Sequence, residues 1–278
     1  MKHRLCVAPE FPKLRVPGID SATTIKDSRM AALPEFHGKS AIVTGGARGL
    51  GRAIAQMLVE RGAQVAIIDL NGQAAAETAD ELRRNDGIVH DIAGDIRFRD
   101  GARAAVTTAA ARLGALDILV NNAGVYPRKP LLEIDDQAWD HTFDVNLRGM
   151  YHVTCVAVPL MQARKGGRIV SIASIDAHIP YPKNAHYAAA KAGVISFTRS
   201  FAEACAADQI LVNAVSPGPI ATQQLRDLGI LADLEKNAPL GRVAAPEDIA
   251  EVVCFLASSR NRFITGETII ASGGIVMA

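Results

Sequence analysis

Short, uninterrupted apolar runs alternate with stretches of helical period from residue 40 to the C-terminus. The apolar runs predict strands at 40–44, 64–69, 88–94, 116–121, 167–173 and 210–215, with a last one near 268–271. Helices are expected between them, near 49–62, 73–85, 98–113, 135–164, 185–207 and 246–258. An apolar run without polar alternation indicates a strand covered on both faces, and hence a parallel sheet. This order predicts an α/β fold, a doubly wound parallel sheet of about seven strands with helices on both faces.

The N-terminal part of the chain does not share this pattern. Residues 1–37 contain prolines and scattered charges, with neither a helical nor a strand period and without the apolar core of a secretory signal. We expect 1–37 to be a flexible N-terminal extension, with an alternative start at Met30 and a subunit contact as the other interpretations. No break in composition divides residues 38–278, so we expect a single domain there.

Composition restricts the partners that this chain can bind. Its 30 basic and 29 acidic residues leave a net charge of +1, which provides no electrostatic footprint for nucleic acid or an anionic membrane. No apolar run is long enough to span a membrane. The four cysteines are scattered without C-x-x-C spacing, which favours a reducing compartment over a disulfide framework or a zinc site. We therefore expect a cytoplasmic protein that binds a small molecule and no metal.

A glycine-rich segment, T-G-G-A-R-G-L-G (44–51), directly follows the first predicted strand and opens the next helix. Glycine at 45, 49 and 51 permits a tight turn and lets the backbone approach a pyrophosphate closely. The helix start then directs free N–H groups and the positive end of its dipole at the phosphates. Glycine clusters are common in turns, but this strand–turn–helix context is typical of dinucleotide binding.

Asp69 ends the second predicted strand, 18 residues after Gly51. In a dinucleotide-binding fold such a carboxylate accepts hydrogen bonds from the adenosine ribose, although it could also cap a turn. A 2′-phosphate on that ribose would be repelled by roughly 3–4 kcal/mol per unit charge at an effective dielectric near 20. Arg48 acts in the opposite sense, because its guanidinium could neutralise the phosphate. Since Arg48 can turn to solvent, we predict NAD over NADP.

Tyr187 and Lys191 are separated by three alanines in H-Y-A-A-A-K-A-G (186–193). On a helix this spacing places both side chains on one face, one turn or roughly 6 Å apart along the axis. Taken alone, it is typical of an exposed pair on an alanine-rich helix.

Six motifs together resemble the short-chain dehydrogenase/reductase family in its compact single-domain form. In order along 38–278, these are T-G-G-A-R-G-L-G (44–51), G-D-I (94–96), N-N-A-G (121–124), N-L (146–147), S-I-D-A-H-I-P-Y-P-K-N-A-H-Y-A-A-A-K (174–191) and P-G-P-I-A-T (217–222). The resemblance implies a single NAD-binding catalytic domain with the Rossmann fold. One departure is A-S-G-G (271–274), where the family often has an aspartate. We expect Ser272 to serve packing or a subunit contact.

The resemblance implies a catalytic set of four residues. Tyr187 is expected to be the general acid and base. A free phenol has a pKa near 10, and the Lys191 ammonium would favour its ionised form. Ser174 is expected to orient the substrate oxygen, although a polar residue at a strand end is the ordinary alternative. Asn146 is expected to hold a water that links Lys191 to solvent, unless its side chain merely satisfies nearby backbone.

The resemblance also implies which residues contact the cofactor. Asp95 and Ile96 are expected at the adenine, and the segment 217–222 at the nicotinamide. The complete set of expected cofactor contacts is Gly45, Arg48, Gly49, Leu50, Gly51, Asp69, Leu70, Asp95, Ile96, Asn122, Ala123, Gly124, Tyr187, Lys191, Pro217, Gly218, Ile220 and Thr222.

These features predict an NAD-dependent oxidoreductase that interconverts a secondary alcohol and a ketone without metal. The alternatives are an NADP-dependent 3-oxoacyl (acyl-carrier) reductase-like enzyme and a non-catalytic dinucleotide-binding regulator. A polar, hydroxylated substrate is expected from the candidate pocket residues, which are Tyr126, Arg128, Asp176, His178, Tyr181 and His186. Residues 223–240 are a candidate lid. The family commonly forms tetramers, so we expect a homotetramer or a homodimer.

Overall fold

The computed structural model describes residues 33–84, 87–227, 229 and 231–277. Most of the predicted extension, residues 1–32, lies outside this range. A compact unit begins at Pro34. Phe36 is only 1% exposed and its N–H donates to the Arg61 carbonyl at 2.8 Å, so residues just before the first strand already pack against this unit.

The predicted parallel sheet is confirmed. Its strand order is β3-β2-β1-β4-β5-β6-β7, and each neighbouring pair is parallel. The strands are β1 (Ser40–Thr44), β2 (Gln64–Asp69), β3 (Val89–Ala93), β4 (Ile118–Asn121), β5 (Gly167–Ile172), β6 (Ile210–Pro217) and β7 (Thr268–Ala271). The chain runs outward in one direction from β1 to β3 and in the other from β4 to β7. A crevice forms where the direction reverses, at the carboxyl ends of β1 and β4.

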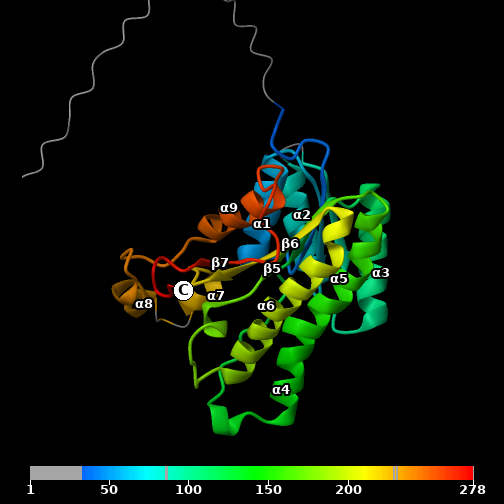
Figure 1. Cartoon of the computed structure of the whole chain (residues 1–278). Helices are drawn as coiled ribbons and strands as arrows, with labels where there is room; N and C mark the ends of the chain where they lie inside the picture. The colour runs from blue at the N-terminus through cyan, green and yellow to red at the C-terminus, as the bar shows by residue number, and fades with distance from the viewer. Residues whose placement is uncertain (1–32, 85–86, 228, 230, 278) are drawn as a thin grey trace, which may run out of the picture. The chain divides into compact units, whose positions relative to one another are not determined.

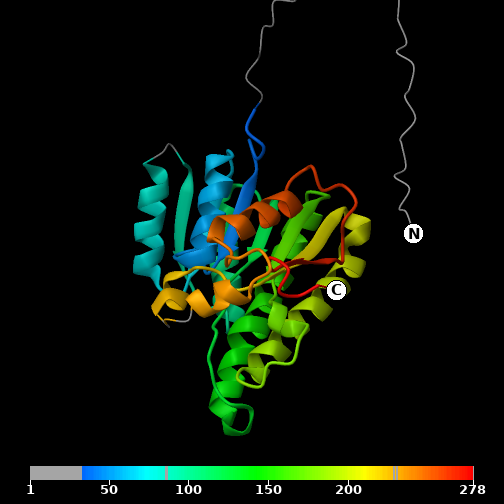
Figure 2. The same ribbon diagram turned by 90° about the vertical axis from the view of Figure 1, so that its left-hand side faces the viewer.

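Helices cover both faces of the sheet, as the apolar strands predicted (Figures 1 and 2). One face is covered by α1 (Gly49–Glu60), α2 (Gly72–Arg83) and α9 (Pro246–Ala257). The other is covered by α3 (Arg99–Leu113), α5 (Gly149–Gln162) and α6 (Ala185–Cys205). Among the described residues, no helix combines the length and apolar character needed to cross a membrane.

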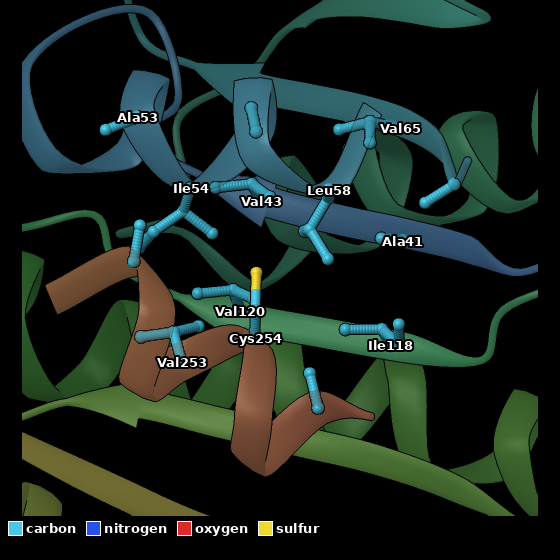
Figure 3. Packing of buried hydrophobic residues seen from close by; sticks show 14 of the residues in the cluster. Ala41, Val43, Ala53, Ile54, Leu58, Val65, Ile118, Val120, Val253 and Cys254 are labelled. Carbon is cyan, nitrogen blue, oxygen red and sulfur yellow. The ribbon is translucent and has the colours of Figure 1, made fainter. Parts of the chain in front are cut away.

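Successive side chains of the central strands point to opposite faces of the sheet and so contribute to the hydrophobic core on each face. In β1, Val43 packs with α1 and α9, whereas Ile42 packs with the helices of the opposite face. Figure 3 shows Ile54 of α1, Cys254 of α9, Val43 and the β4 residue Val120 in the same buried cluster. Burying a side chain of this size stabilises the fold by about 1.5–3 kcal/mol. The sheet is thereby a rigid support for the loops at its carboxyl edge.

The long helix predicted over 135–164 is present, but it contains a π-helical turn that we did not predict. The segment consists of α4 (Asp136–Phe143), a π-helical turn (Asp144–Arg148) and α5. The Gly149 N–H donates to the Asp144 carbonyl, five residues earlier. The Thr142 carbonyl instead accepts the side-chain amide of Asn146 at 2.9 Å. An asparagine side chain inserted into the backbone ladder therefore accompanies the wider turn, a feature often found at functional sites.

Two short helices fall in the segment 223–240, for which we predicted no secondary structure. They are α7 (Gln223–Asp227) and α8 (Leu231–Asn237). At the same end of the sheet, α4 and the first turns of α6 project beyond the carboxyl ends of the strands (Figures 1 and 2). The loops after β4 and β5, together with the helices α4 and α6, thus surround the edge of the sheet where the predicted site residues lie.

Candidate active site

The glycine loop between β1 and α1 leaves no room for side chains. A Cβ on Gly51 would lie 2.1 Å from the Gly45 carbonyl oxygen. A Cβ on Gly45 would lie 2.8 Å from the Ala123 Cα, and its φ of +64° also favours glycine. Arg48 occupies the N-cap of α1, and its side chain makes no capping hydrogen bond. The first N–H groups of α1 are therefore available to an anion.

Asn122 holds this loop in place from the neighbouring strand. Its side-chain Nδ2 donates to the carbonyls of Thr44 at 2.9 Å and Gly45 at 3.0 Å. The Thr44 hydroxyl in turn accepts the N–H groups of Asn122 and Ala123, both at 3.1 Å. The resemblance predicted Asn122 only as a cofactor contact, whereas its side chain also fixes the backbone that would cradle a phosphate.

A cleft of about 1030 Å³ opens along the carboxyl edge of β1, β2, β3 and β4. This volume is at the upper end of the range for ligand pockets. The predicted cofactor residues that line it are Gly45, Arg48, Gly49, Leu50, Gly51, Asp69, Leu70, Asp95, Ile96, Asn122, Ala123, Gly124 and Thr222. A cleft of this size, with a glycine cradle at its floor, fits an extended dinucleotide.

Asp69 is held in a fixed orientation beside the glycine loop. Its Oδ2 accepts the Ala47 N–H at 3.2 Å and its Oδ1 accepts the Asn71 N–H at 3.0 Å. Each carboxylate oxygen has two lone pairs, so both can still accept hydrogen bonds from a ligand. Arg48 is exposed on the same cleft.

Asp95 reaches the cleft with its carboxylate already paired. The Arg97 guanidinium donates to both carboxylate oxygens, at 2.6 Å and 3.0 Å for the two shortest contacts. The Arg97 side chain holds the pKa of Asp95 below its usual range. Ile96 is buried, and its Cδ1 would touch a Cβ on Gly149 at 2.9 Å.

Ser174, Tyr187 and Lys191 converge beyond the end of β5. Ser174 caps a short 3₁₀ turn (Ile175–Ala177), and its hydroxyl lies close enough to the Tyr187 phenol to act on the pKa of that phenol. Tyr187 and Lys191 lie on one face of α6, with the Lys191 Nζ 5.6 Å from the centre of the tyrosine ring. That Nζ donates to the Ile172 carbonyl at 2.7 Å and is buried. The pair is thus not an exposed one.

Burial dominates the electrostatics of this trio. It lowers the pKa of Lys191 to about 8, because an ammonium loses its hydration there. Burial also raises the pKa of Tyr187; the nearby Ser174 hydroxyl opposes this rise and the charge of Asp176 adds to it. The lowering of the Tyr187 pKa that we expected from Lys191 is not found: Lys191 is not among the groups that shift it, and the net shift is upward.

Asn146 faces Lys191 across Gly124. The Asn146 amide nitrogen donates to the carbonyls of Val125 and Thr142, and its Oδ1 accepts the Val125 N–H at 3.3 Å. A Cβ on Gly124 would lie 2.7 Å from Oδ1 and 3.6 Å from the Lys191 Nζ. The backbone of Gly124 thus runs beside both polar groups, and Oδ1 keeps a further lone pair.

The segment after β6 is fixed to the C-terminal region. The Gly218 N–H donates to the Ala271 carbonyl at 3.0 Å, and Ile220 pairs with Ala244 in an isolated bridge. A Cβ on Gly218 would lie 3.0 Å from the Ser272 Cα. Ser272 is buried beside this turn and its hydroxyl bonds to the backbone of Val276, which is a packing role. Pro217, the last residue of β6, pairs with Ala271.

The candidate substrate residues do not all have the same surroundings. Tyr126 packs edge-on against Tyr187 with ring centres 4.7 Å apart, and its hydroxyl donates to the Asp176 Oδ2 at 3.3 Å. Arg128 lies 5.9 Å from the centre of the Tyr126 ring. His186, by contrast, is fully buried, and both of its ring nitrogens lack a hydrogen-bond partner.

Two further candidates lie around this group. The His178 Nε2 contacts the Ser216 hydroxyl at 2.9 Å. Tyr181 lies close enough to Tyr126 to act on the pKa of its hydroxyl, which is raised chiefly by burial.

Several cleft residues escaped the sequence analysis. They come from elements that meet only in the folded chain. Gly94 belongs to the G-D-I motif and two others to the candidate lid, but none was expected at the cofactor. The set is Ile68, Gly94, Arg97, Val125, His141, Val145, Gln223 and Asp227. Gln223 and Asp227 are in α7, so the candidate lid segment does contribute to the cleft wall.

Comparison with known proteins places this site in a family. Residues 45–276 match the family described as enoyl-(acyl carrier protein) reductase. The chain is 36% identical over 242 residues to the 3-oxoacyl-(acyl-carrier-protein) reductase FabG of Staphylococcus aureus, covering 86% of this chain and 98% of that protein. The protein of the same name from Vibrio harveyi is 38% identical over 244 residues, covering 87% of this chain and 99% of that protein.

A solved structure agrees with these relatives. A short-chain type dehydrogenase/reductase from Mycobacterium marinum superposes with a TM-score of 0.84 at 32% identity, covering 88% of this chain and 98% of that one. The chain therefore belongs to the short-chain dehydrogenase/reductase family and is an NAD(P)-dependent oxidoreductase that acts on CH–OH groups.

Proposed function

We propose that this enzyme interconverts a secondary alcohol and its ketone, with the Tyr187 hydroxyl as general acid and base. The observation that carries the proposal is the convergence of Ser174 on the Tyr187 phenol, with the buried Lys191 one turn further along the same helix face. In the direction of reduction, the Tyr187 hydroxyl donates its proton to the carbonyl oxygen while Ser174 orients that oxygen. A nicotinamide supplies or accepts the hydride when it is bound.

Lys191 and Asn146 assist the transfer of the proton that Tyr187 donates. The Lys191 ammonium stabilises the phenolate electrostatically, which offsets part of the cost of burying a negative charge. The free lone pair of the Asn146 Oδ1 supports a bound water between it and Lys191, by which the proton would be replaced from solvent. The glycine loop and residues 217–222 would hold the dinucleotide so that its reactive ring reaches Tyr187.

We propose NAD as the preferred cofactor. The fixed Asp69 carboxylate can accept hydrogen bonds from both ribose hydroxyls and repels a 2′-phosphate. Arg48, exposed on the same cleft, supports the alternative, since its guanidinium could pair with that phosphate.

A second candidate is a reductase for 3-oxoacyl groups, with NADP as cofactor. The names of the relatives in Staphylococcus aureus and Vibrio harveyi favour it over our first interpretation. The polar and charged side chains around Tyr126 favour a hydroxylated small molecule instead. In either case we propose one catalytic domain over residues 38–278, a cytoplasmic location and a homotetramer or homodimer.

The test is an assay of the purified full chain with both cofactors. Secondary alcohols, hydroxyketones and an acetoacetyl thioester would each be offered with NAD(H) and with NADP(H). We expect activity with NAD(H), and we expect Tyr187→Phe to lower turnover at least about a hundredfold while dinucleotide binding persists. Tyr151→Phe, at a half-buried tyrosine of α5, is the matched control. Turnover retained by Tyr187→Phe would remove this residue from the reaction, and activity confined to the thioester with NADPH would establish the second candidate.

A further inference from the structure

A carboxylate lies buried next to the catalytic pair without an ion-pair partner. Asp176 is 9% exposed and follows Ser174 by two residues, in the 3₁₀ turn that Ser174 caps. Its backbone N–H donates to the Ser174 hydroxyl at 3.2 Å. Among the described residues, no lysine or arginine forms a salt bridge with it. Burying an unpaired carboxylate is costly, so a position like this one calls for an explanation.

Tyr126 fixes where this carboxylate points. The Tyr126 hydroxyl donates to the Asp176 Oδ2 at 3.3 Å, while the Tyr126 ring packs edge-on against Tyr187 at 4.7 Å between ring centres. The other oxygen, Oδ1, accepts no hydrogen bond from the described residues. The charge of Asp176 reaches Tyr187 strongly enough to raise its pKa. An acceptor with spare capacity therefore lies close to the oxygen that exchanges a proton with the substrate.

The environment of Asp176 selects among possible hydrogen-bond donors. A carboxylate in a partly dry site binds a donor more strongly than it would in water, and it repels groups that can only accept. Arg128 stands over the Tyr126 ring, and its positive charge acts on Asp176. That charge disfavours a cationic donor such as an ammonium. A neutral hydroxyl satisfies Asp176 without this repulsion.

We propose that Asp176 is a specificity-determining residue that accepts a hydrogen bond from a hydroxyl adjacent to the reacting carbon. The substrates are then vicinal diols in oxidation and α-hydroxyketones in reduction. This inference rests on the proposed function, because it assigns a substrate class to the site in which Tyr187 acts. The inference distinguishes the two candidate functions, because a 3-oxoacyl thioester carries only acceptor groups beside its ketone. Such a substrate would leave the Asp176 Oδ1 without a donor.

The test compares two alcohols that differ by one hydroxyl. Oxidation of cyclohexane-1,2-diol, in its cis and trans forms, and of cyclohexanol is measured with NAD for the wild-type enzyme and for Asp176→Ala. The quantity compared is the ratio of kcat/KM for the diol to kcat/KM for cyclohexanol. This ratio cancels changes in the pKa of Tyr187, since both alcohols give their proton to the same phenolate. We expect wild type to prefer a diol, and Asp176→Ala to lower the ratio at least about tenfold.

Two further variants control the comparison. Asp176→Asn retains an acceptor without the charge, so its ratio should lie between those of wild type and Asp176→Ala. Asp100→Ala, at an exposed carboxylate in the first turn of α3, should keep the wild-type ratio. A ratio that Asp176→Ala leaves unchanged overturns the inference, even if both rates fall together, because equal losses indicate a structural role. If wild type oxidises none of these alcohols and reduces none of the ketones, the proposed function itself fails.

Discussion

The two sides of the candidate active site, which we assign to cofactor and substrate, are built differently. On the cofactor side, the walls are backbone: glycines at 45 and 51 leave space that no side chain could share, and Asn122 holds the loop by its carbonyls. On the substrate side, the walls are side chains such as Tyr126 and Asp176, delivered by the loops after β4 and β5. Both sides meet at the same carboxyl edge of the sheet.

This contrast distinguishes the backbone cradle, which every enzyme of such a fold must keep, from the substrate-side residues, which each enzyme can vary. A backbone cradle recognises a group shared by all dinucleotides, so its shape leaves little freedom for substitution. A wall of side chains can be changed residue by residue without disturbing the sheet beneath it. We therefore expect substitutions on the cofactor side to abolish binding and those on the substrate side to redirect specificity.

The strongest test of a backbone-built cofactor side is Gly51→Ala. The added Cβ would lie 2.1 Å from the Gly45 carbonyl oxygen and 2.4 Å from the Asn122 Nδ2, so the loop and its brace must both shift. Overpacking of this kind costs about 1–3 kcal/mol of stability. We expect NAD affinity to fall at least about a hundredfold, measured by titration of the purified protein.

Gly166→Ala is the matched control for that substitution. A Cβ at Gly166 would meet only the Gln209 carbonyl oxygen, at 3.9 Å, and this glycine lies far from the cleft. NAD affinity should be unchanged there. Wild-type affinity in Gly51→Ala would show that the loop has more freedom than its close contacts indicate.

The same contrast explains how much of the molecule could be predicted from sequence. The sheet was predictable because uninterrupted apolar runs such as 64–69 mark strands that are buried on both faces. The glycine loop was predictable because its conformational demand is local to 44–51. The candidate catalytic side chains were predicted by family resemblance, and the structure brings Ser174, Tyr187 and Lys191 together.

The failures of prediction concern contacts between distant segments. The π-turn at 144–148 depends on Asn146 bonding both to Thr142 and to the backbone of Val125, which comes from another loop. A helical period does not reveal such a bond, because the residues on either side of the turn remain good helix formers. The pairing of Arg97 with Asp95 was missed for a different reason, since two charged residues near a strand end carry no distinctive pattern.

Asp69→Asn probes the carboxylate that we expect to distinguish NAD from NADP. Asparagine keeps an acceptor for the N–H of Ala47 or Asn71 but removes the negative charge. The repulsion of a 2′-phosphate is then lost, while Arg48 stays in the cleft. We expect the preference for NAD over NADP, as a ratio of kcat/KM, to fall at least about tenfold. A wild-type enzyme that already prefers NADP would contradict the role given to Asp69.

Lys191→Met gives the smallest effect and tests the junction between the two sides. Burial lowers the pKa of Lys191 to about 8, whereas an unfolded lysine titrates near 10.4. Between these values the unfolded chain binds more protons than the folded one, so this group makes stability rise with pH. Below about pH 8 the cost of the buried ammonium is present in full, and above pH 10 it is gone.

Methionine fills a similar volume without a charge, so it should remove this pH dependence. Urea unfolding of both proteins without cofactor, from pH 7 to 9.5, isolates the contribution of Lys191, since most other titrating groups are common to the two. The unfolding free energy of wild type should rise relative to that of Lys191→Met by up to about 1.4 kcal/mol per pH unit above pH 8. Parallel curves would mean that the ammonium is hydrated in the folded protein. The junction would then be open to water, and the phenol beside it would titrate as an exposed group.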